Sequence, residues 1–252
     1  EDPAQVTIAV NQMQWAKGVD AALDELLAGG GPDGSALKDY AASQIDGLAE
    51  LITITRTNLT KPERTRVMVL ITMDTHNRDV IANYLLKQGV YDKTNFLWAS
   101  QLRPVFMTET ETITFEICDA RVPYGYEYLG NSFRLVITPL TDKCYLTLMG
   151  ALQMIFGGAP AGPAGTGKTE TVKDMGRTLG LWVCVTNCTD QQRHTDCAKI
   201  FKGLCQGGMW GCFDEFNRIR LPVLSVVAQQ VLAIQNAKKG NLKSFSFPGE
   251  SN

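Results

Sequence analysis

The sequence predicts an α/β fold in which a mainly helical segment precedes a parallel sheet covered by helices. Two patterns support this prediction. Apolar residues recur at helical intervals over about the first hundred residues, whereas beyond about residue 160 short apolar strands alternate with helices. The chain has 252 residues, of which 44% are hydrophobic, so it is large enough to bury one large core or two smaller ones.

The helical part contains three expected helices. Two of them, at about residues 13–27 and 37–51, flank the glycine-rich break at 29–34. The third begins with a capping box over Thr60–Glu63 and continues along one apolar face to Gly89, a residue suited to end a helix. This part contains no recognisable site, so we expect it to be a packed scaffold.

The pattern changes after about residue 108. The alternating, β-branched segment 112–117 predicts a strand, and 135–138 is a second short extended run closed by a proline. Residues 141–156 then predict a helix. We place a domain boundary near residue 120, which divides the chain into 1–120 and 121–252.

The most informative motif is the segment 162–169, which fits the phosphate-binding pattern G-x-x-x-x-G-K-[ST]. Its glycines let successive backbone N–H groups turn toward phosphate oxygens, Lys168 would reach the β- and γ-phosphates, and Thr169 would bind Mg²⁺. The expected nucleotide-binding residues of this loop are Gly162, Pro163, Ala164, Gly165, Thr166, Gly167, Lys168 and Thr169.

The segment just before this loop leaves two alternatives open. A phosphate loop normally follows an apolar strand, but here the small residues 157–161 intervene. Their propensities predict a loop, although small residues also fit a short central strand that helices press from both sides.

A second motif, which is acidic, follows the phosphate loop. The apolar run 210–213 ends in Asp214 and Glu215, as required at the carboxyl edge of a strand that faces a phosphate loop. Asp214 would hold Mg²⁺, mostly through water, and Glu215 would polarise the attacking water as general base. The intervening segments alternate: helix 169–179, strand 181–186 and helix 196–205, with a last helix at 222–239.

Composition disfavours several other classes of function. The net charge of −2 and the absence of any Lys/Arg run longer than Lys238–Lys239 argue against nucleic-acid binding. No apolar stretch approaches the ~18 residues of a membrane span. The seven cysteines, without a secretory signal, predict small buried side chains in a reducing compartment rather than a zinc site. His76 and His194 have no evident catalytic partner and are expected to be structural or exposed.

Four segments carry a resemblance to a known family. Residues 124–130, 135–143, 162–174 and 211–218 resemble the dynein heavy chain where its linker meets the first AAA+ module of the motor ring. The resemblance implies that 1–120 is the C-terminal part of the helical linker. It also implies that 121–252 is the N-terminal part of the module's large subdomain, a P-loop NTPase fold that ends here before the sensor-1 residue. The N-terminus lacks an initiator Met, so we expect a piece of a longer protein. The run from Asp190 to Trp210 resembles axonemal members more than cytoplasmic ones.

The resemblance implies an ATP-hydrolysing microtubule motor whose linker swings as the module cycles. The implied cofactors are ATP or ADP and Mg²⁺. The implied partners are neighbouring AAA+ modules, microtubules through parts absent here, and dynein intermediate and light chains, without nucleic acid or membrane. The implied location is the cytoplasm and cytoskeleton, in the axoneme of a cilium or flagellum. The implied roles are catalysis by Glu215 and Lys168, Mg²⁺ binding by Thr169 and Asp214, and an adenine wall of Pro139 and Leu140.

Two other classes of function stay open. The chain could be a regulatory module that binds nucleotide without hydrolysing it, although Glu215 beside Asp214 argues against that. Residues 1–120 alone fit a structural lever or docking element. A GTPase is disfavoured because the chain has no Asn-Lys-x-Asp segment. Because the arginine finger of a neighbour contributes ~10³–10⁵ in rate in such enzymes, we expect the isolated chain to turn over very slowly.

Overall fold

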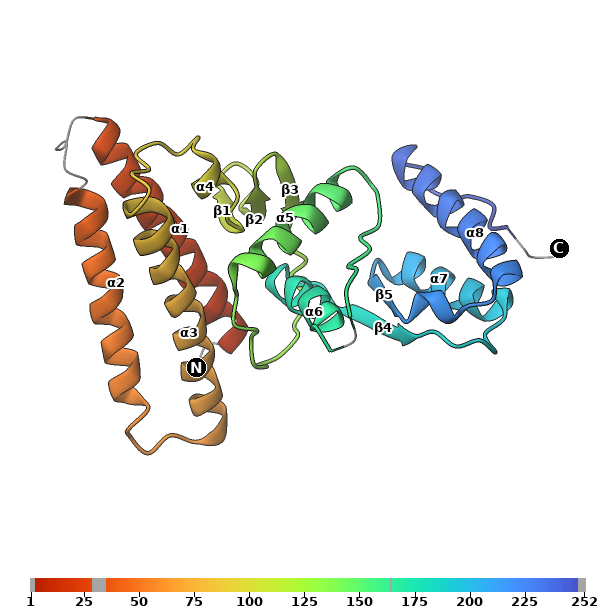
Figure 1. Ribbon diagram of the computed structural model, residues 1–252, viewed down its shortest axis with the longest axis horizontal. Helices are drawn as coiled ribbons and strands as arrows, with labels where there is room; N and C mark the ends of the chain where they lie inside the picture. The colour runs from red at the N-terminus through yellow and green to blue at the C-terminus, as the bar shows by residue number, and fades with distance from the viewer. Residues whose placement is uncertain (1–2, 29–34, 164, 249–252) are drawn as a thin grey trace. The chain divides into compact units, whose positions relative to one another are not determined.

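The computed structural model describes residues 3–28, 35–163 and 165–248, and the chain forms two compact units, 1–150 and 151–252 (Figure 1). The predicted glycine-rich break at 29–34 therefore lies outside the described residues. The elements of the first unit are α1 (Ala4–Leu27), α2 (Ser35–Ile54), α3 (Lys61–Asp79), the π-helix η1 (Val80–Leu86), α4 (Phe96–Ala99), β1 (Arg103–Met107), β2 (Thr112–Ile117), β3 (Ala120–Pro123) and α5 (Pro139–Gln153), whose last turn enters the second unit.

The three predicted helices of the first unit are confirmed, and the first two are longer than their apolar patterns indicated. The expected helix up to Gly89 consists of α3 continued by the π-helix η1, and Gly89 follows with φ +64°. The predicted capping interaction is present at the start of α3, where the Glu63 carboxylate accepts from the Thr60 N–H (2.8 Å) and hydroxyl (2.7 Å). These bonds satisfy polar groups that a helix start otherwise leaves to water.

The core of the first unit is apolar and centres on two indole rings. Trp15 of α1 and Trp98 of α4 pack edge to face with their ring centroids 5.3 Å apart. The residues buried around them from α1, α2 and η1 include Val19, Leu23, Leu37, Val80, Ile81 and Leu85. Helical spacing predicted most of these positions, whereas the contact between the two indoles arises from packing.

A three-stranded antiparallel sheet completes the first unit, with strand order β1-β2-β3. The strand predicted at 112–117 is confirmed as β2. The flanking strands were not predicted because Pro104 interrupts the pattern of β1 and because β3 has only four residues.

The extended run predicted at 135–138 does not form a strand. Residues 124–138 have no regular secondary structure, and α5 begins at Pro139. β-Branched residues favour a strand only where a neighbouring strand completes the ladder, and Val136 instead leaves 73% of its surface exposed. Of the two alternatives for residues 157–161, the structure has the loop.

The second unit has the predicted alternation of strands and helices. Its elements are α6 (Lys168–Thr178), β4 (Val183–Asn187), α7 (His194–Gly207), β5 (Trp210–Asp214), the 3₁₀-helix η2 (Phe216–Arg218) and α8 (Leu221–Lys239). β4 and β5 pair in parallel, so their carboxyl ends lie at one edge. α6 packs on both strands, and α7 packs on β5 and α8. The small core on the α7 side contains Cys197, Phe201, Phe213 and Val227.

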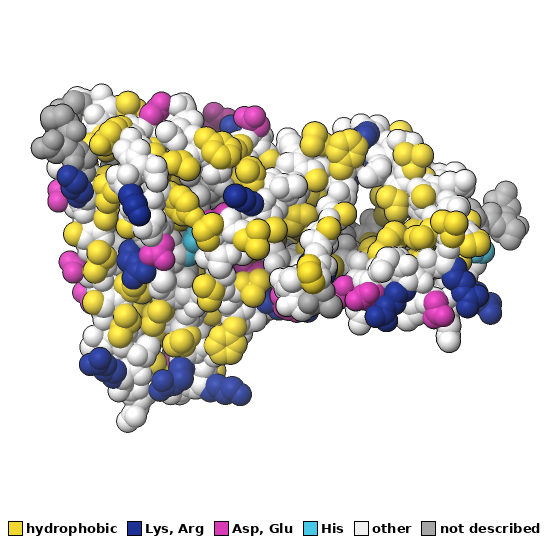
Figure 2. All heavy atoms as spheres, in the orientation of Figure 1, with side chains coloured by type: hydrophobic (Ala, Val, Ile, Leu, Met, Phe, Trp, Pro, Cys, Tyr) yellow, Lys and Arg dark blue, Asp and Glu magenta, His cyan; other side chains and the backbone are white. Residues whose placement is uncertain are grey.

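The surface of the first unit carries a basic tip. Figure 2 shows Lys and Arg side chains where α2 and α3 are joined, and the exposed basic residues of this connection are Arg56, Lys61 and Arg64. Among the described helices, none combines the length and apolar character needed to cross a bilayer.

Candidate active site

The phosphate-binding motif forms a loop that ends at the start of α6. Gly165 and Gly167 have φ of +78° and +80°, a backbone conformation that side chains with a Cβ rarely adopt. The Thr166 hydroxyl donates to the Pro163 carbonyl at 2.9 Å, which closes the loop on itself. Ala164, a predicted member of the loop, lies outside the described residues.

Lys168, the first residue of α6, lies with its ammonium inside this loop. Its Nζ donates to the carbonyls of Gly162 and Pro163, both at 2.8 Å. A cation held by carbonyl dipoles can exchange these bonds for stronger, charge-assisted bonds to phosphate oxygens. The loop thus presents its lysine at the helix N-terminus, where the dipole also favours an anion.

The loop and the acidic motif meet through one side-chain hydrogen bond. The Thr169 hydroxyl donates to Oδ2 of Asp214 at 2.9 Å, across 45 residues of sequence. Asp214 ends β5 directly opposite Asn187, the last residue of β4. Its other oxygen, Oδ1, accepts the backbone N–H of Glu215 at 3.0 Å. Parallel pairing therefore brings the carboxylate to the loop, as predicted.

These two side chains fit a magnesium ion. Mg²⁺ binds oxygen ligands octahedrally at roughly 2.0–2.1 Å, so adjacent ligands lie roughly 2.8–3.0 Å apart. The Thr169 and Asp214 oxygens have this separation, and both are hard oxygen donors. Among the described residues, no group of three or more His, Cys, Asp and Glu side chains could hold a metal ion, so a magnesium site here needs further ligands from phosphate or water.

Glu215 begins a tight turn after β5. It has φ +52° and ψ +39°, and the 3₁₀-helix η2 follows it. Its Oε2 lies 3.3 Å from Nε of Arg218, and about half of its side chain is exposed. The turn ends the strand abruptly and places Glu215 beside Asp214 at the same edge.

A close contact between α6 and β4 supports the phosphate loop, which leads into α6. A Cβ added to Gly176 of α6 would lie 2.3 Å from Cγ2 of Val183 in β4 and 3.0 Å from the Leu181 carbonyl oxygen. Only glycine allows this approach, which holds α6, and hence Lys168 and Thr169, against the sheet.

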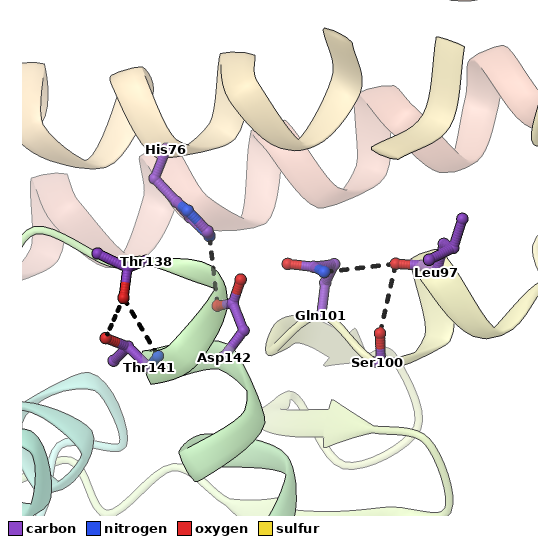
Figure 3. Close-up of polar contacts among 7 residues, drawn as sticks. All are labelled: His76, Leu97, Ser100, Gln101, Thr138, Thr141 and Asp142. Carbon is purple, nitrogen blue, oxygen red and sulfur yellow. Dashed lines mark hydrogen bonds and ion pairs between the residues drawn. The ribbon is translucent and has the colours of Figure 1, made fainter. Parts of the chain in front are cut away.

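The remaining predicted site residues, Pro139 and Leu140, lie in the first unit. They form the first turn of α5 and are both exposed, Leu140 by 73%. The same turn carries Asp142, which faces His76 of α3 with Nε2 and Oδ1 3.9 Å apart (Figure 3). His76 is thus not surface-exposed: its side chain is 16% accessible.

Burial drives both members of this pair toward their neutral forms. It lowers the pKa of His76 to about 4, against a smaller opposing effect of Asp79, and it raises the pKa of Asp142 to about 6. Burial, assisted by the charges of Asp142 and Asp79, also raises the pKa of Tyr84. Near neutral pH the ring is therefore uncharged beside an ionised carboxylate.

Several cysteines lie near the acidic edge. Burial raises the pKa of Cys188 and of Cys212, and the Asp214 carboxylate adds to both shifts. Burial likewise raises the pKa of Cys197, which packs in the α7 side of the core. These groups are protonated thiols at neutral pH and behave as small apolar side chains.

One residue and one contact among the residues described above were not identified from the sequence. Asn187 ends β4 opposite Asp214, and the signal that could have found it is a polar residue closing an apolar strand. The contact of His76 with Asp142 had no such signal, because the two residues belong to different helices.

Comparisons with known proteins show the family of the chain. The family described as "Hydrolytic ATP binding site of dynein motor region" matches residues 124–252. The chain is similar to human dynein axonemal heavy chain 17, with 48% identity over 98% of this chain and 6% of that protein. It is also similar to human dynein axonemal heavy chain 9 (50%, 99% of this chain and 6% of that protein). A ciliary dynein beta chain of Tripneustes gratilla is 48% identical over 98% of this chain and 6% of its own length. The chain thus spans about 6% of the length of these relatives.

Proposed function

Because the chain belongs to the family of hydrolytic ATP-binding sites of the dynein motor region, we propose that it binds and hydrolyses ATP with Mg²⁺ as part of a microtubule motor. The observation that carries this proposal is the 2.9 Å hydrogen bond from Thr169 to Asp214. It joins the phosphate loop to the acidic strand end, and phosphoryl transfer requires these two parts together.

The proposed roles follow from the position of each side chain. Lys168 and the loop N–H groups bind the phosphates, and Thr169 and Asp214 hold Mg²⁺, which neutralises charge on the phosphate oxygens when bound. Glu215 accepts a proton from the attacking water, oriented by its backbone bond to Asp214 and by Arg218. Pro139 and Leu140 form an apolar wall for adenine.

We further propose that residues 1–120 are the C-terminal part of a linker that swings during the ATP cycle, and that 121–252 begin the first AAA+ module of the ring. The family match from residue 124 supports the second assignment. In the parent protein the module would contact neighbouring AAA+ modules, microtubules through other segments, and intermediate and light chains. Since the relatives are named axonemal or ciliary, we place the motor in the cytoskeleton of a cilium or flagellum.

The alternative function is a regulatory module that retains nucleotide without hydrolysing it. Such a module needs the phosphate loop but not the general base. The presence of Glu215 directly after Asp214, at the same strand end, favours hydrolysis.

The two functions differ in the response to Glu215→Gln in the parent heavy chain. We expect this variant to keep its affinity for MgATP and to lose turnover by about 10²-fold or more, because the binding groups survive and the water loses its base. Equilibrium binding and steady-state ATP hydrolysis measure the two effects.

Lys168→Ala is the matched control, and we expect it to weaken nucleotide binding itself. Unchanged turnover in Glu215→Gln would assign this site to regulation. Equal loss of binding in both variants would contradict the separate roles of the two residues.

A further inference from the structure

The turn after β5 has a backbone conformation that its residue type disfavours. Glu215 has φ +52° and ψ +39°, a left-handed conformation that residues with a Cβ rarely adopt. A residue keeps such a conformation only where the surrounding structure holds it, and residues of this kind are concentrated at functional sites. The contacts that hold Glu215 therefore bear on its function, and all of those described below lie within the second unit.

The 3₁₀-helix η2 fixes the backbone of this turn. The Arg218 N–H donates to the Glu215 carbonyl at 2.9 Å, and the Ile219 N–H donates to the Phe216 carbonyl at 3.3 Å. In a 3₁₀-helix the side chains of residues i and i+3 lie one above the other. Glu215 and Arg218 have this spacing, so the turn places the guanidinium beside the carboxylate, with Nε and Oε2 3.3 Å apart.

Two apolar residues attach η2 to the rest of the second unit. Phe216 packs on Phe213 of β5 nearly edge to face, with the ring centroids 6.4 Å apart. Phe213 also packs on Phe201 of α7, at a centroid distance of 5.1 Å. Ile219, which follows η2, is only 3% exposed. The turn is thus anchored on the strand that ends in Asp214.

The ion pair between Arg218 and Glu215 contributes little to the stability of the fold. The two side chains are 61% and 46% exposed, and water screens ion pairs of this kind. Its effect is on the direction of the Glu215 side chain, because pairing restricts the rotamers that this side chain can adopt. Hydrolysis depends on that direction, since a misplacement of about 1 Å at a reacting group can cost about 10²-fold in rate.

We propose that Arg218 and Phe216 are positioning residues, which hold the Glu215 carboxylate at the end of β5 and thereby determine the rate of hydrolysis. This inference rests on the proposed function, in which Glu215 is the general base. Both residues act through Glu215 and not on the nucleotide. They therefore raise kcat without adding to the affinity for ATP, which the phosphate loop supplies.

Steady-state hydrolysis and equilibrium MgATP binding in the parent heavy chain test this role. Arg218→Met keeps the length of the side chain but removes its donors, and we expect kcat to fall by roughly tenfold to 10²-fold. KM and Kd for MgATP should change less than about twofold. Arg218→Lys keeps the positive charge and should recover most of kcat. Arg220→Met is the matched control and should preserve kcat, because Arg220 instead faces Asp190, with Nη2 and Oδ2 4.0 Å apart.

Two further variants test whether the positioning residues act through Glu215. Phe216→Leu removes the ring contact with Phe213, so it should lower kcat and speed hydrogen exchange at the Arg218 amide, whose bond closes the turn. In the Glu215→Gln background, Arg218→Met should reduce the residual turnover less than about twofold, because the effects of residues that act as a unit are not additive.

The outcomes distinguish this inference from the function on which it rests. Unchanged kcat in both Arg218→Met and Phe216→Leu would overturn the positioning role, and loss of turnover in Glu215→Gln would still support the ATPase. A full additional loss in the Glu215→Gln background would also overturn it, since Arg218 would then act independently of the base. So would weaker MgATP binding in Arg218→Met. Unchanged turnover in Glu215→Gln would instead contradict the proposed function itself.

Discussion

Backbone conformation explains the glycines of the phosphate loop residue by residue. Gly165 and Gly167 have positive φ, and a Cβ built on either one meets no atom within 4 Å. Their need for glycine is thus conformational and not a matter of space, and their spacing before Lys168 is the reason that the motif could be recognised from the sequence.

This distinction predicts the effect of Gly167→Ala. A left-handed conformation costs an L-residue roughly 1–2 kcal/mol, so relaxation of the loop should weaken ATP binding by about tenfold. Titration of the parent heavy chain with labelled nucleotide measures the change. Gly157→Ala is the matched control, because Gly157 has open space and no positive φ. A similar loss in both variants would show that composition, not backbone conformation, determines the loop.

At the scale of elements, two helices carry glycines with opposite constraints. Gly176 of α6 lies against Val183 and the Leu181 carbonyl, whereas Gly203 of α7 is exposed with open space around it. Both are α-helical, so helix propensity alone treats them alike. Only tertiary contact separates them.

We expect Gly176→Ala to destabilise the second unit by about 1–3 kcal/mol through overpacking. Gly203→Ala should stabilise it by roughly 0.5–1 kcal/mol, because alanine loses less backbone entropy in a helix. Urea unfolding of the chain, followed by circular dichroism, measures both. Stabilisation by Gly176→Ala would mean that α6 and β4 are further apart than the structure indicates.

A second prediction at this scale concerns the join between α1 and the segment after β3. The Gln5 amide donates to the Tyr124 hydroxyl (2.8 Å) and the Glu127 carbonyl (2.7 Å), and it accepts the Leu129 N–H (2.8 Å). Gln5→Leu would remove these three partly buried hydrogen bonds, at a cost of about 1–3 kcal/mol. Faster hydrogen exchange at the Leu129 amide is the expected result, with Gln14→Leu on the exposed face of α1 as control. Unchanged exchange at Leu129 would mean that other contacts hold the segment.

For the molecule as a whole, the buried pair of His76 and Asp142 determines part of the pH dependence of stability. The pKa of His76 falls from 6.5 to about 4 on folding, so its contribution is lost as pH falls across this window. The pKa of Asp142 rises from 3.8 to about 6, so its contribution is lost as pH rises between these values. Between about pH 4 and 6 the contributions of the two residues to the change of stability with pH have opposite signs and nearly cancel.

Single variants should reveal how each residue contributes to the change of stability with pH. Relative to the unmodified chain, Asp142→Asn should gain stability with rising pH between about 4 and 6, and His76→Gln should lose stability with rising pH between about 4 and 6.5. One proton of difference corresponds to at most about 1.4 kcal/mol per pH unit. Urea unfolding at several pH values measures these differences. If the curves of stability against pH for both variants ran parallel to that of the unmodified chain, the assigned protonation states would be contradicted.

The sequence alone determined the features whose information is local. Glycine spacing predicted the phosphate loop, an apolar run ending in Asp214 and Glu215 predicted the acidic strand end, and periodicity predicted the helices. The run 135–138 failed as a strand because a strand depends on a neighbour and not on its own residues. Only the tertiary structure decided which distant side chains meet: Thr169 with Asp214, Gln5 with Tyr124, and His76 with Asp142. Such contacts depend on how whole elements pack, which no short stretch of sequence encodes.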